Sequence, residues 1–139
     1  MGQSAFIRFV QGSTVPSLTL DELKDQLINY RDQLALTGKQ LDWQYEDVCF
    51  PYTIETKPEG EGRWFYLKGK YRHYESIVFG VDKEQVGEDE RHYVQVVLPE
   101  GHTHGDKNKG NELCKYLAKH LKAELQLFNG RVMYFNPRK

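Results

Sequence analysis

The stretch GHTHGDKNKG, residues 101–110, gathers side chains that bind metals or anions within ten positions. His102 and His104 are two residues apart, so in an extended segment both side chains point the same way. Imidazole nitrogens are good ligands for zinc and iron at neutral pH. Asp106 would supply a third ligand, or else a histidine brought in by the fold: His73, His92 or His120. One hypothesis is therefore a small metal-dependent enzyme built on His102, His104 and Asp106.

The glycines of the same stretch indicate a second chemistry, the binding of an anion. Gly105 and Gly110 have the G-x-x-x-x-G spacing with which backbone N–H groups surround a phosphate at the start of a helix. The next two residues are Asn and Glu rather than Lys and Ser or Thr, which excludes nucleotide hydrolysis of the P-loop kind. A simpler site remains, in which the helix N-terminus and two lysines attract the anion. It comprises Gly105, Asp106, Lys107, Lys109 and Gly110.

The same residues also have a purely structural interpretation. Asp106 or Asn108 would cap a helix over about residues 109–122, and the glycines would turn the chain out of the strand before it. This interpretation needs neither the histidines nor the lysines, and it is compatible with an anion site. We therefore expect a capped helix entry that is also the main ligand contact.

Other catalytic patterns are missing from the sequence. There is no G-x-S-x-G motif, and neither Cys49 nor Cys114 lies in a protease or oxidoreductase context. Cys114 falls on the apolar side of the second helix, which predicts a core residue rather than a nucleophile. The segment KGKYRHY, residues 68–74, alternates basic and aromatic side chains, yet an isoelectric point near 6.5 argues against nucleic acid as a partner.

Charge and cysteine content indicate a cytoplasmic protein with a basic end. Residues 1–100 contain 11 Lys and Arg against 17 Asp and Glu, whereas residues 101–139 contain 8 against 3. The basic end would attract a small anionic ligand or an acidic protein. Two cysteines without a CxxC motif fit a reducing compartment. No segment has the roughly 18 apolar residues that span a bilayer, so we expect no membrane contact.

The first helix has clear boundary signals. Thr19 and Glu22 form a capping box, and Leu18 and Leu23 form a hydrophobic staple around it. Gly38 follows the last apolar turn and is expected to end the helix. Its apolar residues recur at steps of three and four, so one face of the helix must pack on another element.

Strand-length runs rich in β-formers occupy most of the rest of the chain. The acidic segment DKEQVGEDER, residues 82–91, reads as an exposed loop. Asn129-Gly130 joins the runs ELQLF and RVMYF, which predicts a type I′ hairpin at the end of the chain. Strands are expected at residues 5–10, 52–56, 63–68, 74–81 and 92–98.

The order β-α-β-β-β-β-α-β-β predicts an α+β fold in a single domain, residues 1–139. Strands grouped between two helices favour a largely antiparallel sheet with both helices packed on one face. The second face of the sheet would be aromatic, with Trp64, Tyr66, Tyr93 and Tyr134 as its expected members. Such a face is a candidate binding surface or homodimer interface.

Three segments carry a resemblance to a known family: GRWFYL, VVLPEGHTHGDKNKGNELCKYLA and LFNGRVMYFNPRK. With these the chain resembles, nearly end to end, a small uncharacterised family of Bacillus-type bacteria, a domain of unknown function. The resemblance implies a single α+β domain in a bacterial cytosol. It implies no catalytic residue.

The sequence therefore favours a non-enzymatic cytosolic module without a cofactor. Its main expected contact is the segment 99–112, which would bind an anionic ligand or an acidic partner. The first alternative is the small enzyme with zinc or iron described above. The second is a homodimer that uses the aromatic sheet face only for interaction.

Overall fold

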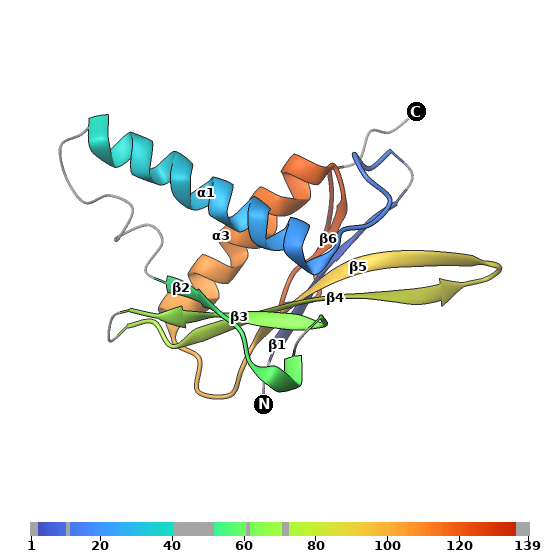
Figure 1. Ribbon diagram of the computed structural model, residues 1–139. Coiled ribbons are helices and arrows are strands. Elements are labelled where there is room, and N and C mark those ends of the chain that lie inside the picture. Colours follow the sequence, from blue (N-terminus) through green and yellow to red (C-terminus); the bar gives the residue numbers. More distant parts are fainter. Residues whose placement is uncertain (1–2, 11, 41–51, 61, 71–72, 136–139) are drawn as a thin grey trace.

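The computed structural model describes residues 3–10, 12–40, 52–60, 62–70 and 73–135. Two long helices lie across one side of a twisted sheet (Figure 1). Neither described helix has an apolar stretch of the length and hydropathy needed to cross a membrane. The elements are β1 (Gln3–Arg8), α1 (Leu20–Gln40), β2 (Tyr52–Glu55), the 3-10 helix η1 (Pro58–Gly60), β3 (Trp64–Gly69), β4 (Ser76–Val86), β5 (Asp89–Leu98), α3 (His104–Leu121), β6 (Glu124–Gln126) and β7 (Val132–Tyr134).

The sheet has seven strands in the order β2-β3-β4-β5-β1-β6-β7, and neighbouring strands are antiparallel. The first strand of the chain therefore lies inside the sheet, between β5 and β6. The predicted α+β class, the order of elements and the placement of both helices on one face are confirmed. The second sheet face carries no helix of the described chain.

Alternation along the strands decides which side chains form the core. In β3, Phe65 and Leu67 are fully buried, whereas Trp64 and Tyr66 on the other face are half-buried. The stacked rings of Phe65 and Phe79 lie beneath the helices, with centroids 5.8 Å apart. Helix side chains complete this core: Leu23, Leu27, Leu113, Cys114, Leu117 and Leu121. The prediction that Cys114 is a core residue is confirmed.

Helix α1 begins as its capping box predicts. The Thr19 N–H donates to Glu22 Oε1 over 3.0 Å, and the Glu22 N–H donates to Thr19 Oγ1 over 3.1 Å. Its end was predicted wrongly, because the helix continues to Gln40 and Gly38 lies inside it. A glycine in a helix costs only about 1 kcal/mol relative to alanine, so Gly38 alone does not end the helix.

Helix α3 begins at His104, about five residues before the predicted start. Its N-cap is Thr103, and neither Asp106 nor Asn108, which were the predicted caps. Asp106 occupies the third helical position and completes a capping box with Thr103. The aspartate here accepts a hydrogen bond from the N-cap N–H, a role that glutamate usually has in a capping box. The pattern T-x-x-D therefore does not match the usual S/T-x-x-E sequence signature.

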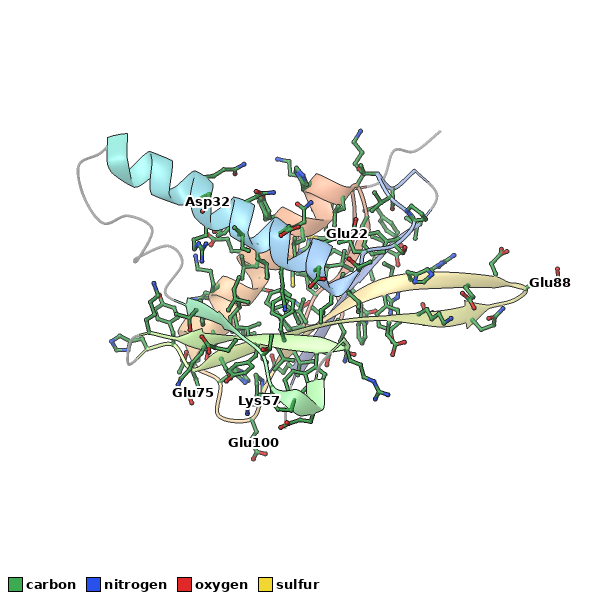
Figure 2. All side chains as sticks on the ribbon, in the orientation of Figure 1. Glu22, Asp32, Lys57, Glu75, Glu88 and Glu100 are labelled. Atoms are coloured by element: carbon green, nitrogen blue, oxygen red, sulfur yellow. The ribbon has the colours of Figure 1, made fainter. Side chains whose placement is uncertain are left out.

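The predicted acidic loop is instead a two-stranded ribbon. Strands β4 and β5 pair from Val78↔Val97 to Val86↔Asp89. Strand β3 pairs with β4 only as far as Gly80, and β1 pairs with β5 only as far as Tyr93. Beyond these residues β4 and β5 therefore pair only with each other. Gly87 forms the turn with a φ of +64°. The ribbon projects from the body, with Glu88 at its tip (Figure 2).

The terminal hairpin is present, but its turn is not of type I′. That turn needs positive φ at both central residues, and of the pair Asn129-Gly130 only Gly130 has one, at +87°. The Gly130 N–H donates to Leu127 O over 2.9 Å, and the Leu127 N–H donates to Arg131 O over 2.8 Å. This is a longer loop closed by a left-handed glycine.

Candidate functional site

The aspartate of the opening stretch lies at the centre of a buried hydrogen-bond network. Asp106 is fully buried. Its Oδ1 accepts from the Tyr52 hydroxyl over 2.6 Å and from the Glu75 N–H over 3.0 Å. Its Oδ2 accepts from the N–H groups of Thr103 and Glu75 over 3.0 Å, and of Ser76 over 3.4 Å. The carboxylate thus joins the start of α3 to β2 and to the start of β4.

This network uses the acceptor capacity of Asp106 inside the protein. A carboxylate offers about four lone-pair sites, and five donor contacts converge on them. Burial and the hydrogen bond to Asp106 raise the pKa of Tyr52 well above its ordinary value, so its hydroxyl remains a donor. Asp106 also places its charge at the N-terminus of α3, where a bound anion would have to lie.

Three of the predicted glycine and lysine ligands, Gly105, Gly110 and Lys109, also have close neighbours inside the protein. A Cβ on Gly105 would lie 2.7 Å from His73 O, and one on Gly110 would lie 3.2 Å from the Phe128 ring. Lys109 pairs with Glu112, and its ammonium lies 6.0 Å from the centroid of the Tyr30 ring. Lys107 is half-buried.

Glu112 connects the two helices. Its carboxylate accepts from the Tyr30 hydroxyl of α1 over 2.6 Å and from Lys109. Burial alone would raise the pKa of Glu112, but the hydrogen bonds from Lys109 and Tyr30 lower it below its ordinary value. Lys109 therefore has a local role in holding α1 against α3.

The predicted histidine ligands do not form a metal site with Asp106 in the described part of the chain, although the His73 carbonyl lies next to Thr103 and Gly105. A ring nitrogen of His102 lies 2.8 Å from Pro99 O, and His104 is exposed at the start of α3. His120 is exposed and stacks on Tyr116, with centroids 5.8 Å apart. Among the described residues, no three His, Cys, Asp or Glu side chains come close enough together to hold a metal ion. Metal binding stays a prediction, and the positions of these histidine side chains do not support it.

The side of the sheet that no described helix covers is here called the open face. The strand registers place all four predicted aromatic residues on it: Trp64, Tyr66, Tyr93 and Tyr134. They also add Phe6, Val78, Val97 and Val132, which sequence reasoning missed. The signal for Phe6 was the alternation in QSAFIR, where Ala5 and Ile7 point into the core.

Two large hydrophobic side chains stand out on the open face. Val132 is 39% exposed and Tyr134 is 53% exposed, and both belong to the edge strand β7. Phe6 and Tyr93 meet edge to face nearer the middle, with centroids 5.7 Å apart. The apolar groups thus extend from β3 at one end of the face to β7 at the other.

The charges of the open face largely neutralise one another. Arg8 lies 3.5 Å from Glu84 and 3.7 Å from Glu124, donates to Gln126 Oε1 over 2.8 Å, and stacks over the Phe6 ring. The face carries Arg8, Lys68 and Arg91 as well as Glu55, Asp82, Glu84, Asp89 and Glu124. It therefore presents no single sign of charge to a partner.

A hollow of about 350 Å³ lies on the open face over Gly80. Gly80 lacks a side chain between its neighbours Trp64 and Gln95, and the walls include Val78 and Val97. A Cβ there would lie 3.2 Å from Arg63 O and 3.4 Å from Trp64 Cβ. The glycine is thus closely fitted at its base, while the space above it remains open to an apolar group.

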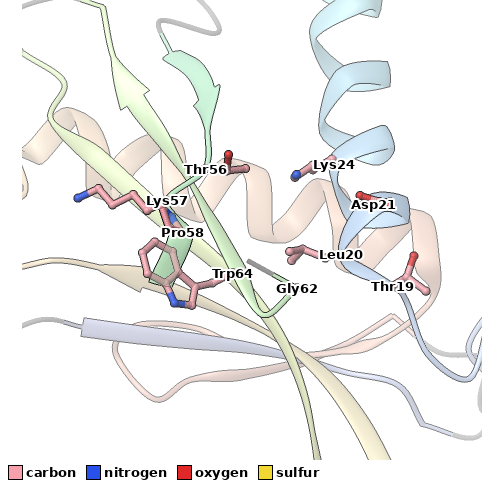
Figure 3. Close-up of a pocket in the computed structure, with 9 residues that line it drawn as sticks. All are labelled: Thr19, Leu20, Asp21, Lys24, Thr56, Lys57, Pro58, Gly62 and Trp64. Carbon is pink, nitrogen blue, oxygen red and sulfur yellow. The ribbon is translucent and has the colours of Figure 1, made fainter. Parts of the chain in front are cut away.

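A larger hollow, of about 690 Å³, lies between the start of α1 and the segment that joins β2 to β3 (Figure 3). Its charged walls are mixed, because Asp21 and Lys24 of α1 line one side and Lys57, on the segment after β2, lines the other. The two ammonium groups lie over aromatic rings, Lys24 at 5.4 Å from the Phe65 centroid and Lys57 at 5.2 Å from that of Tyr66. These lysines are placed by packing, and the hollow has no marked preference for an anion.

Comparisons with known proteins support the resemblance seen in the sequence. A family model described as a domain of unknown function, DUF1885, matches residues 3–137. A solved structure, of a protein of unknown function from Bacillus stearothermophilus, is 40% identical in sequence, with a TM-score of 0.59. The match covers 86% of this chain and 90% of that one. The search of curated proteins finds no match.

Proposed function

The chain belongs to the DUF1885 family, and we propose that it is a non-enzymatic cytosolic module that binds a second copy of itself through the open face of its sheet. The observation that carries this proposal is the open face, where aromatic and aliphatic side chains extend across the sheet and no described helix covers them. An antiparallel sheet tolerates water on one face when that face is polar. This face carries Val132 and Tyr134 exposed at its edge, which favours a partner.

The mixed charge of the open face supports a second copy as that partner. A two-fold dimer brings the same patch together from both subunits, so a patch of one sign would repel itself. The open face instead combines three basic with five acidic side chains, and its central Arg8 is already paired with Glu84 and Glu124. An acidic or basic macromolecule would find no matching surface there.

The proposal is tested by placing a charge at the middle of the open face. Val97→Lys is expected to convert the dimer to a monomer, because a lysine there would be desolvated without a partner. The control Asn29→Lys adds the same side chain on the exposed side of α1 and is expected to leave the dimer intact. Size-exclusion chromatography with light scattering gives both masses.

A second variant distinguishes loss of the dimer from loss of the fold. Tyr134→Glu changes a side chain that is 53% exposed, so the fold is expected to survive, while the dimer is expected to weaken at least about tenfold. Circular dichroism verifies that both variants are folded. Dimers of unchanged strength in folded Val97→Lys and Tyr134→Glu would refute the open face as the contact surface.

The two ligand hypotheses for residues 99–112 stay predictions. The internal contacts of Asp106 and Lys109 favour neither an anion nor zinc or iron at this position. We expect the melting temperature of the wild-type protein to change neither with added inorganic phosphate nor with a chelator. A rise with phosphate would support the anion site, and a fall with the chelator would support the metal-dependent enzyme, because a ligand stabilises the state that binds it.

A further inference from the structure

One row of residues that pair across neighbouring strands of the open face has a recess at one end and a projecting side chain at the other. Across the strands from β4 to β7, the paired residues are Gly80, Gln95, Phe6, Gln126 and Val132. At one end of this row is the hollow of about 350 Å³ over Gly80. At the other end is Val132, 39% exposed on the edge strand. A valine side chain is of a size to enter such a hollow, whose walls Val78 and Val97 are apolar.

Symmetry then fixes the rest of the arrangement. If Val132 of one copy covers Gly80 of the other, a two-fold axis places the second Val132 over the first Gly80. Phe6 lies two strands from Gly80 and two strands from Val132. The axis must therefore run along β1 and pass Phe6, which meets its own counterpart. Aromatic pairs contribute about 0.5–1.5 kcal/mol beyond the area that they bury.

The remaining members of the row fit the same axis. Gln95, one strand from Phe6, comes opposite Gln126, which lies one strand away on the other side. Gln95 Nε2 already donates to Ser4 Oγ over 3.2 Å, and Gln126 Oε1 already accepts from Arg8 over 2.8 Å. These bonds leave the side-chain oxygen Oε1 of Gln95 and the side-chain amide Nε2 of Gln126 for contacts with the other copy. The Gln95 oxygen can accept a hydrogen bond from the Gln126 amide of the other copy, and the two-fold axis forms this pair twice.

The charged neighbours of this row are compatible with the axis. Arg8 lies on β1 and would approach its own counterpart, yet each copy holds it between Glu84 and Glu124. The acidic ribbons project from β4 and β5 and do not lie on the axis, so they stand apart in the dimer. Strands β2 and β3 extend beyond the overlap.

From these features we infer that two copies pack open face to open face about a two-fold axis through Phe6, with Val132 of each seated over Gly80 of the other. The inference rests on the proposed function and defines the docking of its partner. It yields a four-layer particle, with helices outside and two aligned sheets inside.

Disulfide formation between two variants tests this register. Gln95→Cys and Gln126→Cys are purified separately, both with Cys49→Ser, then mixed and oxidised. Cys114 remains, since it is fully buried and burial raises its thiol pKa to about 12, which keeps it unreactive. We expect the mixture to form a covalent heterodimer about a hundredfold faster than either variant alone, because the paired thiols have an effective concentration of about millimolar. A disulfide can join two packed sheets, as it does in immunoglobulin domains.

A control and the oligomeric state separate the possible failures. Glu55→Cys lies on the same face, on β2 outside the overlap, and is expected to form no disulfide with either partner. Phe6→Cys is expected to form a covalent homodimer by itself. Disulfides through Glu55→Cys, or none in the mixture while the protein remains a dimer, would overturn this register and leave the proposed function intact. A monomer at all concentrations would overturn both.

Discussion

Asp106→Ala is expected to lower the free energy of unfolding by about 3 to 5 kcal/mol, the cost of breaking a buried charged network. The change leaves the Tyr52 hydroxyl and the N–H groups of Glu75 and Thr103 without their acceptor. Each buried donor that loses its partner costs about 1 to 3 kcal/mol. Urea denaturation followed by circular dichroism measures the loss.

Two further variants show whether the network accounts for this loss. Asp82→Ala removes a carboxylate from the exposed ribbon and is expected to change the stability by less than about 0.5 kcal/mol. Tyr52→Phe removes one donor and should cost about 1 to 2 kcal/mol, since Asp106 keeps its backbone donors. A loss below about 1 kcal/mol in Asp106→Ala would show that the carboxylate does not hold α3 to the sheet.

Phe79→Ala is expected to lower the free energy of unfolding by about 3 to 5 kcal/mol, as large-to-small changes of buried aromatic residues do. The Phe79 ring is fully buried under the helices and stacks on Phe65. Its removal leaves a cavity that neither neighbouring strand can close. The measurement is urea denaturation of wild type and variant at the same protein concentration.

Phe6→Ala is the matched variant on the other face of the sheet. Phe6 is half-buried in a single copy, so at high dilution its loss is expected to cost only about 1 kcal/mol. At high concentration the wild type gains stability from dimer formation, and this gain is expected to be smaller in Phe6→Ala, whose dimer is weaker. Equal losses for the two phenylalanines at every concentration would contradict the assignment of one face to the core and the other to a partner.

Local signals predicted those elements whose boundaries depend on adjacent residues. The capping box of Thr19 and Glu22 needs only residues three positions apart, and it forms as expected. The apolar side of α3 followed from helical periodicity, and with it the buried Cys114. The order of strands and helices was enough for the α+β class.

The start of α3 required contacts that lie far apart in the sequence. Its two glycines suggested a loop, yet Gly105 is needed where the chain passes His73 O, and Gly110 where it packs on Phe128. Asp106 reaches Tyr52, which is 54 positions away. No pattern within residues 101–110 shows that the aspartate is buried.

The sequence analysis did not predict the ribbon and predicted only part of the open face, for a related reason. Most described side chains of residues 82–91 are exposed to solvent on both faces of the ribbon, so the sequence lacks the alternation that predicts a strand. On the open face, Trp64 and Tyr66 were visible as aromatic residues in a strand-like run. The alignment of Gly80, Phe6 and Val132 depends on strand registers and on the central position of β1.

Sedimentation equilibrium of the wild-type protein over a dilution series tests the central claim most directly. The chain has a mass of 16.3 kDa. Packing through the open face predicts twice this mass at high concentration, with dissociation on dilution, and the chain mass throughout for Val97→Lys. The chain mass at every concentration of the wild type would contradict the account.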